Sequence, residues 1–181
     1  MMQDQMNVML DCVREKLRSI SGIEDTRGIE LAQEIRLASN LYEAVSVQAG
    51  AGEEMSAARW YVLLHLSLAE KLGNSEGVTP TQLSKYQNIS KNTISSLLRG
   101  LEEQGLIERK LDGVDKRFFR IRLSDAGREL VNRDTPLRIA YANQITGELT
   151  ENEKQQLIDL LTKLIHSLMA NHGVKLEFIK D

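Results

Sequence analysis

The fold is decided by residues 78–128, which read VTPTQLSKYQNISKNTISSLLRGLEEQGLIERKLDGVDKRFFRIRLSDAGR. Inside this stretch, apolar residues recur at i, i+3, i+4 and i+7, the spacing of one buried helix face; they are Ile94, Leu97, Leu98 and Leu101. Ser90 precedes them and is a good N-cap, because its hydroxyl can accept a hydrogen bond from a first-turn amide. Gly105 follows them, where a helix ends in a residue with positive φ. The pattern therefore predicts a helix over residues 90–104.

A second, shorter helix is predicted directly before the first. Thr79 is its N-cap, and Pro80 takes the first helical position, where a missing N–H costs nothing. Asn88 can turn the chain through the left-handed region more easily than most residues. Two short helices joined by a tight turn form a helix-turn-helix, whose second helix can enter the major groove of DNA.

After Gly105 the hydrophobic pattern changes from the helical period to a period of two. Phe119, Ile121 and Leu123 alternate with Phe118, Arg120 and Arg122, which indicates a half-buried strand. Residues 106–111 supply its antiparallel partner, and the polar turn 112–117 contains a glycine suited to positive φ. A helix-turn-helix followed by a charged hairpin is a winged helix.

This stretch resembles the MarR family of bacterial transcription regulators over about residues 55–130. At Gln87 the chain departs from the family, which usually places an apolar residue there. Three motifs carry the resemblance, and their joint occurrence in this order is specific: Leu101-Glu102-x-x-Gly105-Leu106-Ile107, Asp115-x-Arg117 and Leu123-Ser124-x-x-Gly127.

The resemblance implies a mainly α fold with a small β-wing. A winged helix-turn-helix domain at residues 55–128 is expected between N-terminal helices at 1–54 and C-terminal helices at 129–181. Apolar stripes on helices 4–20 and 25–47, and a broad stripe after the capping box Thr150–Glu153, suggest more apolar surface than one chain covers. We expect a homodimer built from these terminal helices; packing of the last helix on its own domain is the alternative.

Pro136 lies about a dozen residues into a helix that begins at Ser124. Proline inside a helix removes a hydrogen bond and clashes with the preceding turn. The sequence therefore predicts a kink or a restart at Pro136, with Asp134 or Thr135 as a cap.

The net charge of −3 is unevenly distributed along the chain. Residues 80–128 carry a net charge of +4, residues 1–79 carry −5 and residues 129–181 carry −2. A basic block in an acidic chain is suited to neutralising phosphates. Chance clustering on a solvated surface is the alternative.

The expected DNA-binding residues lie on the polar face of the predicted second helix and in the wing. The resemblance implies that Arg117 reaches the minor groove and that Asp115 braces it; a simple surface ion pair between the two is the alternative. The full set of expected DNA contacts is Lys91, Asn92, Thr93, Ser95, Ser96, Arg99, Lys116 and Arg117.

Regulatory sites are less clearly marked in the sequence. Trp60, Tyr61 and His65 could line a pocket for a small-molecule effector, or they could be ordinary core residues. Cys12 could sense oxidants, as N-terminal cysteines of some family members do, or act as a small apolar residue. No catalytic constellation, phosphate loop or metal-ligand spacing is present, so the sequence predicts no enzyme, no cofactor and no metal. No transmembrane run or signal peptide is apparent, which predicts a cytoplasmic protein without a membrane partner.

Together these observations predict a regulator that binds double-stranded DNA. It would be a homodimeric repressor on a palindromic operator, released by a small-molecule effector. A winged helix that binds protein is one alternative, although its exposed helix face would then be expected to carry apolar residues. Thiol-based redox regulation through Cys12 is another.

Overall fold

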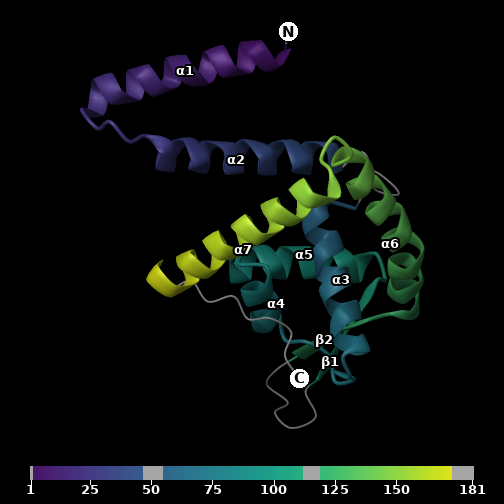
Figure 1. The fold of residues 1–181 in the computed structure, drawn as a ribbon. Helices are drawn as coiled ribbons and strands as arrows, with labels where there is room; N and C mark the ends of the chain where they lie inside the picture. Colours follow the sequence, from purple (N-terminus) through teal and green to yellow (C-terminus); the bar gives the residue numbers. More distant parts are fainter. Residues whose placement is uncertain (1, 47–54, 112–118, 173–181) are drawn as a thin grey trace. The chain divides into compact units, whose positions relative to one another are not determined.

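The computed structural model describes residues 2–46, 55–111 and 119–172. The chain splits into two compact units, Met1–Val45 and Ser46–Asp181. In chain order the elements are α1 (Met2–Ser21), α2 (Arg27–Ser46), α3 (Ala57–Lys71), α4 (Pro80–Tyr86), α5 (Lys91–Glu103), β1 (Ile107–Leu111), β2 (Phe119–Leu123), α6 (Asp125–Ile145) and α7 (Glu151–His172) (Figure 1).

The N-terminal unit consists of two helices joined by a short connection. Gly22, with φ +67°, ends α1. Arg14 of α1 donates from Nε to Oε2 of Glu30 in α2 at 2.7 Å, and the Thr26 hydroxyl donates to the other oxygen of Glu30 at 2.6 Å. These two hydrogen bonds lower the pKa of Glu30. The connection between α1 and α2 is therefore fixed by one carboxylate that accepts from both sides.

The second unit has its hydrophobic core around α3, which packs against α5, α6 and β2. The predicted stripe of α5 faces this core, with Ile94, Leu98 and Leu101 buried and Leu97 partly buried. The remaining core residues come from every element of the winged helix and from α6: Trp60, Val62, Leu63, Leu66, Ala69, Val78, Leu83, Ile107, Ile121, Leu123 and Val131.

The helix-turn-helix forms as its caps predict. Ser90 accepts from the Thr93 amide at 3.1 Å, and Gly105 ends α5 with φ +70°. Asn88 adopts φ +50° in the turn between α4 and α5. At the start of α4, Thr79 and Gln82 form a reciprocal capping box that the sequence analysis did not predict.

The wing is an antiparallel β1–β2 hairpin in which Ile107 pairs with Leu123 and Leu111 pairs with Phe119. Ile121 and Leu123 are buried, but Phe119 is 47 % exposed and differs from the predicted inward-facing pattern. Phe119 and its partner Leu111 lie at the end of the ladder farthest from α6, beyond the reach of the core. The hairpin tip, residues 112–118, lies outside the described residues.

Strand β2 also pairs with the segment that precedes α4. The amide of Val78 donates to the carbonyl of Ile121 at 3.0 Å, and the amide of Ile121 donates back at 2.8 Å. This isolated bridge, which the sequence did not predict, ties the start of the helix-turn-helix to the wing.

Helix α6 begins where predicted but does not restart at Pro136. The hydroxyl of Ser124 accepts from the Gly127 amide at 3.0 Å, and α6 then runs as one helix past Pro136 (Figure 1). Neither predicted cap at Pro136 forms, because Asp134 is buried and the Thr135 hydroxyl donates to the Val131 carbonyl at 2.6 Å. One missing amide is tolerated because the flanking turns still pack against α3.

Helix α7 begins with the predicted capping box, in which the Thr150 amide donates to Glu153 at 2.7 Å. Within the described residues, its apolar stripe is exposed. Leu160 is 65 % exposed, and five other large apolar residues of α7 are also exposed: Leu157, Ile158, Leu161, Ile165 and Leu168.

Gly127 allows the backbone of α6 to approach Leu106, in the turn between α5 and β1. A Cβ added at Gly127 would collide with the carbonyl oxygen of Leu106. We therefore expect Gly127→Ala to lower the free energy of unfolding by about 1–3 kcal/mol, the range for overpacking. Urea unfolding followed by far-ultraviolet circular dichroism measures this change.

The matched control is Gly28→Ala in α2, where an added Cβ would have no atom within 4 Å. That variant should be as stable as the unchanged protein or slightly more so, since Ala is the better helix former. Unchanged stability of Gly127→Ala would contradict the close approach to Leu106.

Candidate nucleic-acid interface

The outer face of α5 carries only polar and cationic side chains in its first two and a half turns. All six residues predicted to read DNA from this helix are exposed: Lys91, Asn92, Thr93, Ser95, Ser96 and Arg99. The hydroxyl of Ser95 donates to the Lys91 carbonyl at 2.8 Å, and the hydroxyls of Thr93 and Ser90 are hydrogen-bonded to each other at 2.8 Å. Within the described residues, no such bond occupies the side chains of Asn92, Ser96 or Arg99. These three side chains therefore keep their full hydrogen-bonding capacity for a partner.

The wing is held to α5, the second helix of the helix-turn-helix and from here on called the recognition helix, by an ion pair. Arg109 of β1 donates from Nε to Oε2 of Glu102 in α5 at 2.7 Å. Both side chains are about a third or more exposed, so the pair contributes at most about 1 kcal/mol. The predicted wing residues Asp115, Lys116 and Arg117 lie in the tip, outside the described part of the chain.

The three residues predicted to line an effector pocket lie on two sides of α3. Trp60 is 5 % exposed, whereas the neighbouring Tyr61 is 43 % exposed. His65 lies one turn further, with Nδ1 2.7 Å from the Tyr61 carbonyl and its ring stacked on Tyr86 of α4 at 5.9 Å. The structure thus brings His65 close to Tyr61 and Tyr86, while Trp60 is directed into the core.

Two residues of α6, Arg138 and Asp134, have surroundings that the sequence did not predict. The guanidinium carbon of Arg138 lies 4.3 Å from the centre of the Trp60 ring, a cation–π geometry. Asp134, one turn earlier, is 1 % exposed. One of its oxygens accepts from Arg133 Nε at 2.7 Å, and the other has no hydrogen-bond partner among the described residues. The only signal in the sequence was the i, i+4 spacing of Asp134 and Arg138 on one helix face.

Gln87, the position where the chain departs from the family pattern, is the C-cap of α4 and is partly buried. Its side-chain nitrogen is buried and has no hydrogen-bond partner within the described residues. An unpaired buried amide costs free energy, so the departure weakens the packing of α4 rather than creating a new contact.

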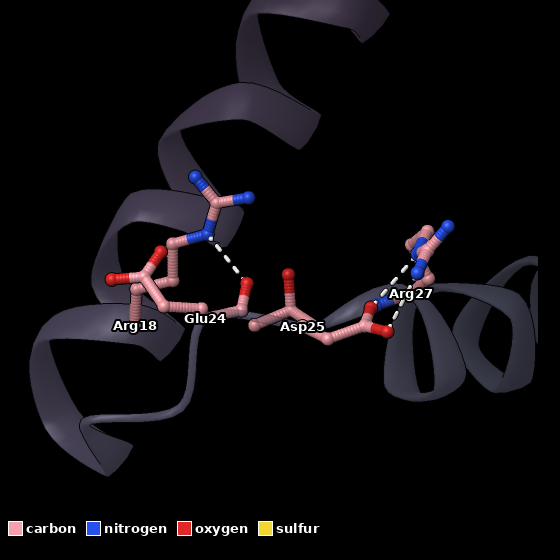
Figure 2. A pocket seen from close by; sticks show the side chains of 5 residues that line it. Arg18, Glu24, Asp25 and Arg27 are labelled. Atoms are coloured by element: carbon pink, nitrogen blue, oxygen red, sulfur yellow. Dashed lines mark hydrogen bonds and ion pairs between the residues drawn. The ribbon is translucent and has the colours of Figure 1, made fainter.

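A shallow hollow lies at the α1–α2 connection of the N-terminal unit, lined by Arg18, Glu24, Asp25, Thr26 and Arg27 (Figure 2). Arg27 and Asp25, two of its charged side chains, pair with each other. Arg27 donates from Nε and Nη2 to the two oxygens of Asp25 at 2.8 and 2.7 Å, and Arg18 donates to the Glu24 carbonyl at 3.1 Å. The hydrogen bonds from Arg27 hold the pKa of Asp25 well below its usual range. The hollow is therefore an open surface lined by charged and polar residues, and it lacks the apolar side chains that line a typical ligand pocket.

Two short helices joined by a tight turn, followed by an antiparallel hairpin, define a winged helix-turn-helix protein. Residues 54–117 match the sequence model of the MarR family, and the winged-helix part of this chain belongs to that family of transcription regulators.

Relatives and solved structures agree with this assignment. The chain is 27 % identical to the HTH-type transcriptional repressor YetL of Bacillus subtilis over 118 residues. This matched stretch covers 65 % of this chain and 68 % of YetL. It is 26 % identical to S. aureus MepR in a crystal structure with DNA, with a TM-score of 0.64 over 76 % of this chain and 95 % of MepR. A structure of Bordetella bronchiseptica BpsR, at 21 % identity, has the same fold, with a TM-score of 0.65 over 75 % of this chain and 98 % of BpsR.

Two further observations bear on the sequence-based expectations. No helix in the described residues is both long enough and apolar enough to cross a lipid bilayer. Cys12 is exposed on α1. A role for this thiol in redox sensing stays a prediction.

Burial lowers the pKa of His65, and the hydrogen bond to Tyr61 opposes that shift only in part. The folded protein therefore binds a proton at His65 less readily than the unfolded chain does. We expect the contribution of His65 to stability to be present above pH 6.5, the ordinary value, and to be lost as the pH falls below it towards the folded-state pKa.

This loss is measured as a difference between the unchanged protein and His65→Gln. The free energy of unfolding should fall less between pH 7.5 and pH 5.5 for the variant than for the unchanged protein, because Gln does not titrate. The carboxylates contribute equally to the fall in both proteins. An identical pH dependence of the two proteins would show that burial does not shift the pKa of His65.

Proposed function

We propose that this protein is a homodimeric repressor that binds a palindromic operator in double-stranded DNA and releases it when a small molecule binds. The observation that carries the proposal is the division of α5 into two faces. Its buried face fixes the helix in the core, and in its first two and a half turns the exposed face presents only polar and cationic groups. A helix of this kind fits the major groove, where side chains such as Arg and Asn read base edges.

Asn92, Ser96 and Arg99 are the proposed base-reading residues, because no internal hydrogen bond occupies their side chains within the described residues. Lys91, Thr93 and Ser95 lie in the first turns of the same face and are proposed to contact phosphates or sugars. Lys116 and Arg117 are proposed to extend the contact from the wing, with Arg117 in a narrow minor groove and Asp115 as its brace.

The proposed homodimer accounts for the apolar face of α7. Six large apolar side chains exposed on one helix are typical of an interaction surface. A second copy of the chain is the partner that the MarR-family resemblance implies, with residues 1–54 and 129–181 supplying the dimerisation helices. Two recognition helices related by a two-fold axis would then require an operator with the same symmetry.

Release by a small molecule is proposed from the surroundings of α3. The BpsR structure concerns regulation of DNA binding by 6-hydroxynicotinic acid, and that protein shares this fold. In the present chain, the candidate residues Trp60, Tyr61 and His65 lie on the helix that packs against both α5 and α6. A ligand at α3 could therefore shift the recognition helix relative to the helices that are proposed to dimerise.

Base reading by Arg99 is tested with a duplex selected from random DNA by the purified protein. A bidentate contact to a base contributes about 1–3 kcal/mol of discrimination. Arg99→Ala should therefore weaken binding to the selected duplex about tenfold more than binding to random duplex. Fluorescence anisotropy titrations of both duplexes measure the two affinities.

The matched control is Glu103→Ala, which changes an exposed charge in the last turn of the same helix. It should leave the ratio between the two affinities unchanged. Equal weakening of both duplexes by Arg99→Ala would make Arg99 a backbone contact.

The dimer is tested by charging the exposed face of α7. Leu160→Glu should convert a dimer into a folded monomer at micromolar concentration, because a charge buried in an interface is costly but a charge on an exposed surface is not. Gln156→Glu adds the same charge at an exposed polar position of α7 and should remain dimeric. Sedimentation equilibrium of the three proteins gives their masses, and an unchanged protein that sediments as a monomer would end the proposal.

A further inference from the structure

Arg59 lies against the backbone of the recognition helix at Gly100. A Cβ added at Gly100 would lie 2.6 Å from Nη2, 3.0 Å from Cζ and 3.3 Å from Nε of Arg59. All three atoms belong to the guanidinium group, so this group occupies the space that any other side chain at position 100 would fill. Helices α3 and α5 pack together, and Arg59 crosses from the first turn of α3 to the flank of α5.

The backbone that carries Arg59 is held in place from both sides. Ser56 caps α3 and accepts from the amide of Arg59 at 3.4 Å. The next residue, Trp60, is buried and lies beneath the guanidinium of Arg138 at 4.3 Å. Arg59 therefore projects from a rigid helical turn, which places its charged end more reliably than a loop would.

The position of Gly100 on α5 places this charge beside the proposed DNA-binding face. Gly100 lies four residues after Ser96 and seven after Thr93, so the three residues share one flank of the helix. Ser96 and Thr93 are exposed, and both belong to the set proposed to contact DNA. The guanidinium of Arg59 thus extends this flank by one positive charge from a different helix.

We infer that Arg59 binds a backbone phosphate of the DNA beside the groove that α5 enters. This inference rests on the proposed DNA binding by α5 and adds a contact that the sequence analysis did not predict. The guanidinium lies on a flank of the helix rather than on its central face, which suits a phosphate and not a base edge. Its five N–H donors include enough for a phosphate even when one partner is within the chain.

A phosphate contact has a signature that packing alone does not have. Each neutralised phosphate contributes about 0.9 to the slope of log affinity against log salt concentration. Arg59→Ala should therefore reduce this slope by about 0.9 for each bound copy of the domain. Affinity should fall about fivefold to tenfold per copy near 0.1 M salt, equally on the selected duplex and on random duplex. Arg59→Lys, which retains the charge, should keep most of the slope.

Gly100→Ala tests the same contact without removing Arg59. The atoms that the new methyl group meets are the movable end of the Arg59 side chain, so the guanidinium is displaced while the fold is retained. Since Ala is a better helix former than Gly, the melting temperature should stay the same or rise. Affinity and salt slope should nevertheless fall, as they do for Arg59→Ala.

The charge-matched control is Lys163→Ala, which removes one exposed cation from α7 and should leave the slope unchanged. The inference is wrong if Arg59→Ala and Gly100→Ala keep the wild-type slope, or if Lys163→Ala lowers it equally. A lower melting temperature of Arg59→Ala with an unchanged slope would make Arg59 a packing residue only. Failure of the proposed function is a separate result, in which the unchanged protein selects no duplex from random DNA.

Discussion

The structure depends on the burial of one apolar stripe on α5. Ile94, Leu98 and Leu101 are removed from water against α3 and the wing, and a fully buried side chain of this size contributes about 1.5–3 kcal/mol. Because a helix is a rigid rod, fixing one face also fixes where the other face points. The polar residues of α5 are held outward by the apolar residues behind them, and no separate device is needed to present them.

Helix α3 links this stripe to the remainder of its unit. One end of α3 is bound to α6 by Arg128, which donates from Nε and Nη2 to the two oxygens of Glu70 at 3.0 and 3.1 Å. The other end is bound to α6 by the stacking of Arg138 on Trp60. Since α3 is bound to α6 at both ends and also packs against α5, we expect α3 and α6 to move together relative to α5.

Local features of the fold could be predicted from the sequence because short-range chemistry determines them. The caps Ser90 and Thr150, the left-handed turn at Asn88 and the helix stop at Gly105 are all present as expected. The family match to residues 54–117 agrees with the motifs around α5 and the wing. The polar face of α5 could also be predicted, since it is the complement of the apolar stripe.

Features that depend on distant partners could not be predicted. Helix α6 continues through Pro136 because tertiary packing against α3 outweighs one lost hydrogen bond. Phe119 follows the alternation of a buried strand, yet the core ends before it is reached. The position of Arg59 beside Gly100 could not be predicted without knowing that α3 and α5 pack together. A glycine within a helix does not indicate which side chain occupies the space beside it.

The bridge between Val78 and Ile121 has a consequence for how this region opens. Both hydrogen bonds of the pair join the segment before α4 to the middle of β2, and both residues are buried. Strand β2 therefore cannot move away from the rest of the domain without also freeing the segment that leads into the helix-turn-helix. We therefore expect the two elements to belong to one cooperative unfolding unit, whose amide hydrogens exchange with solvent together. Binding that orders either element would slow exchange in the other, across more than forty residues of intervening sequence.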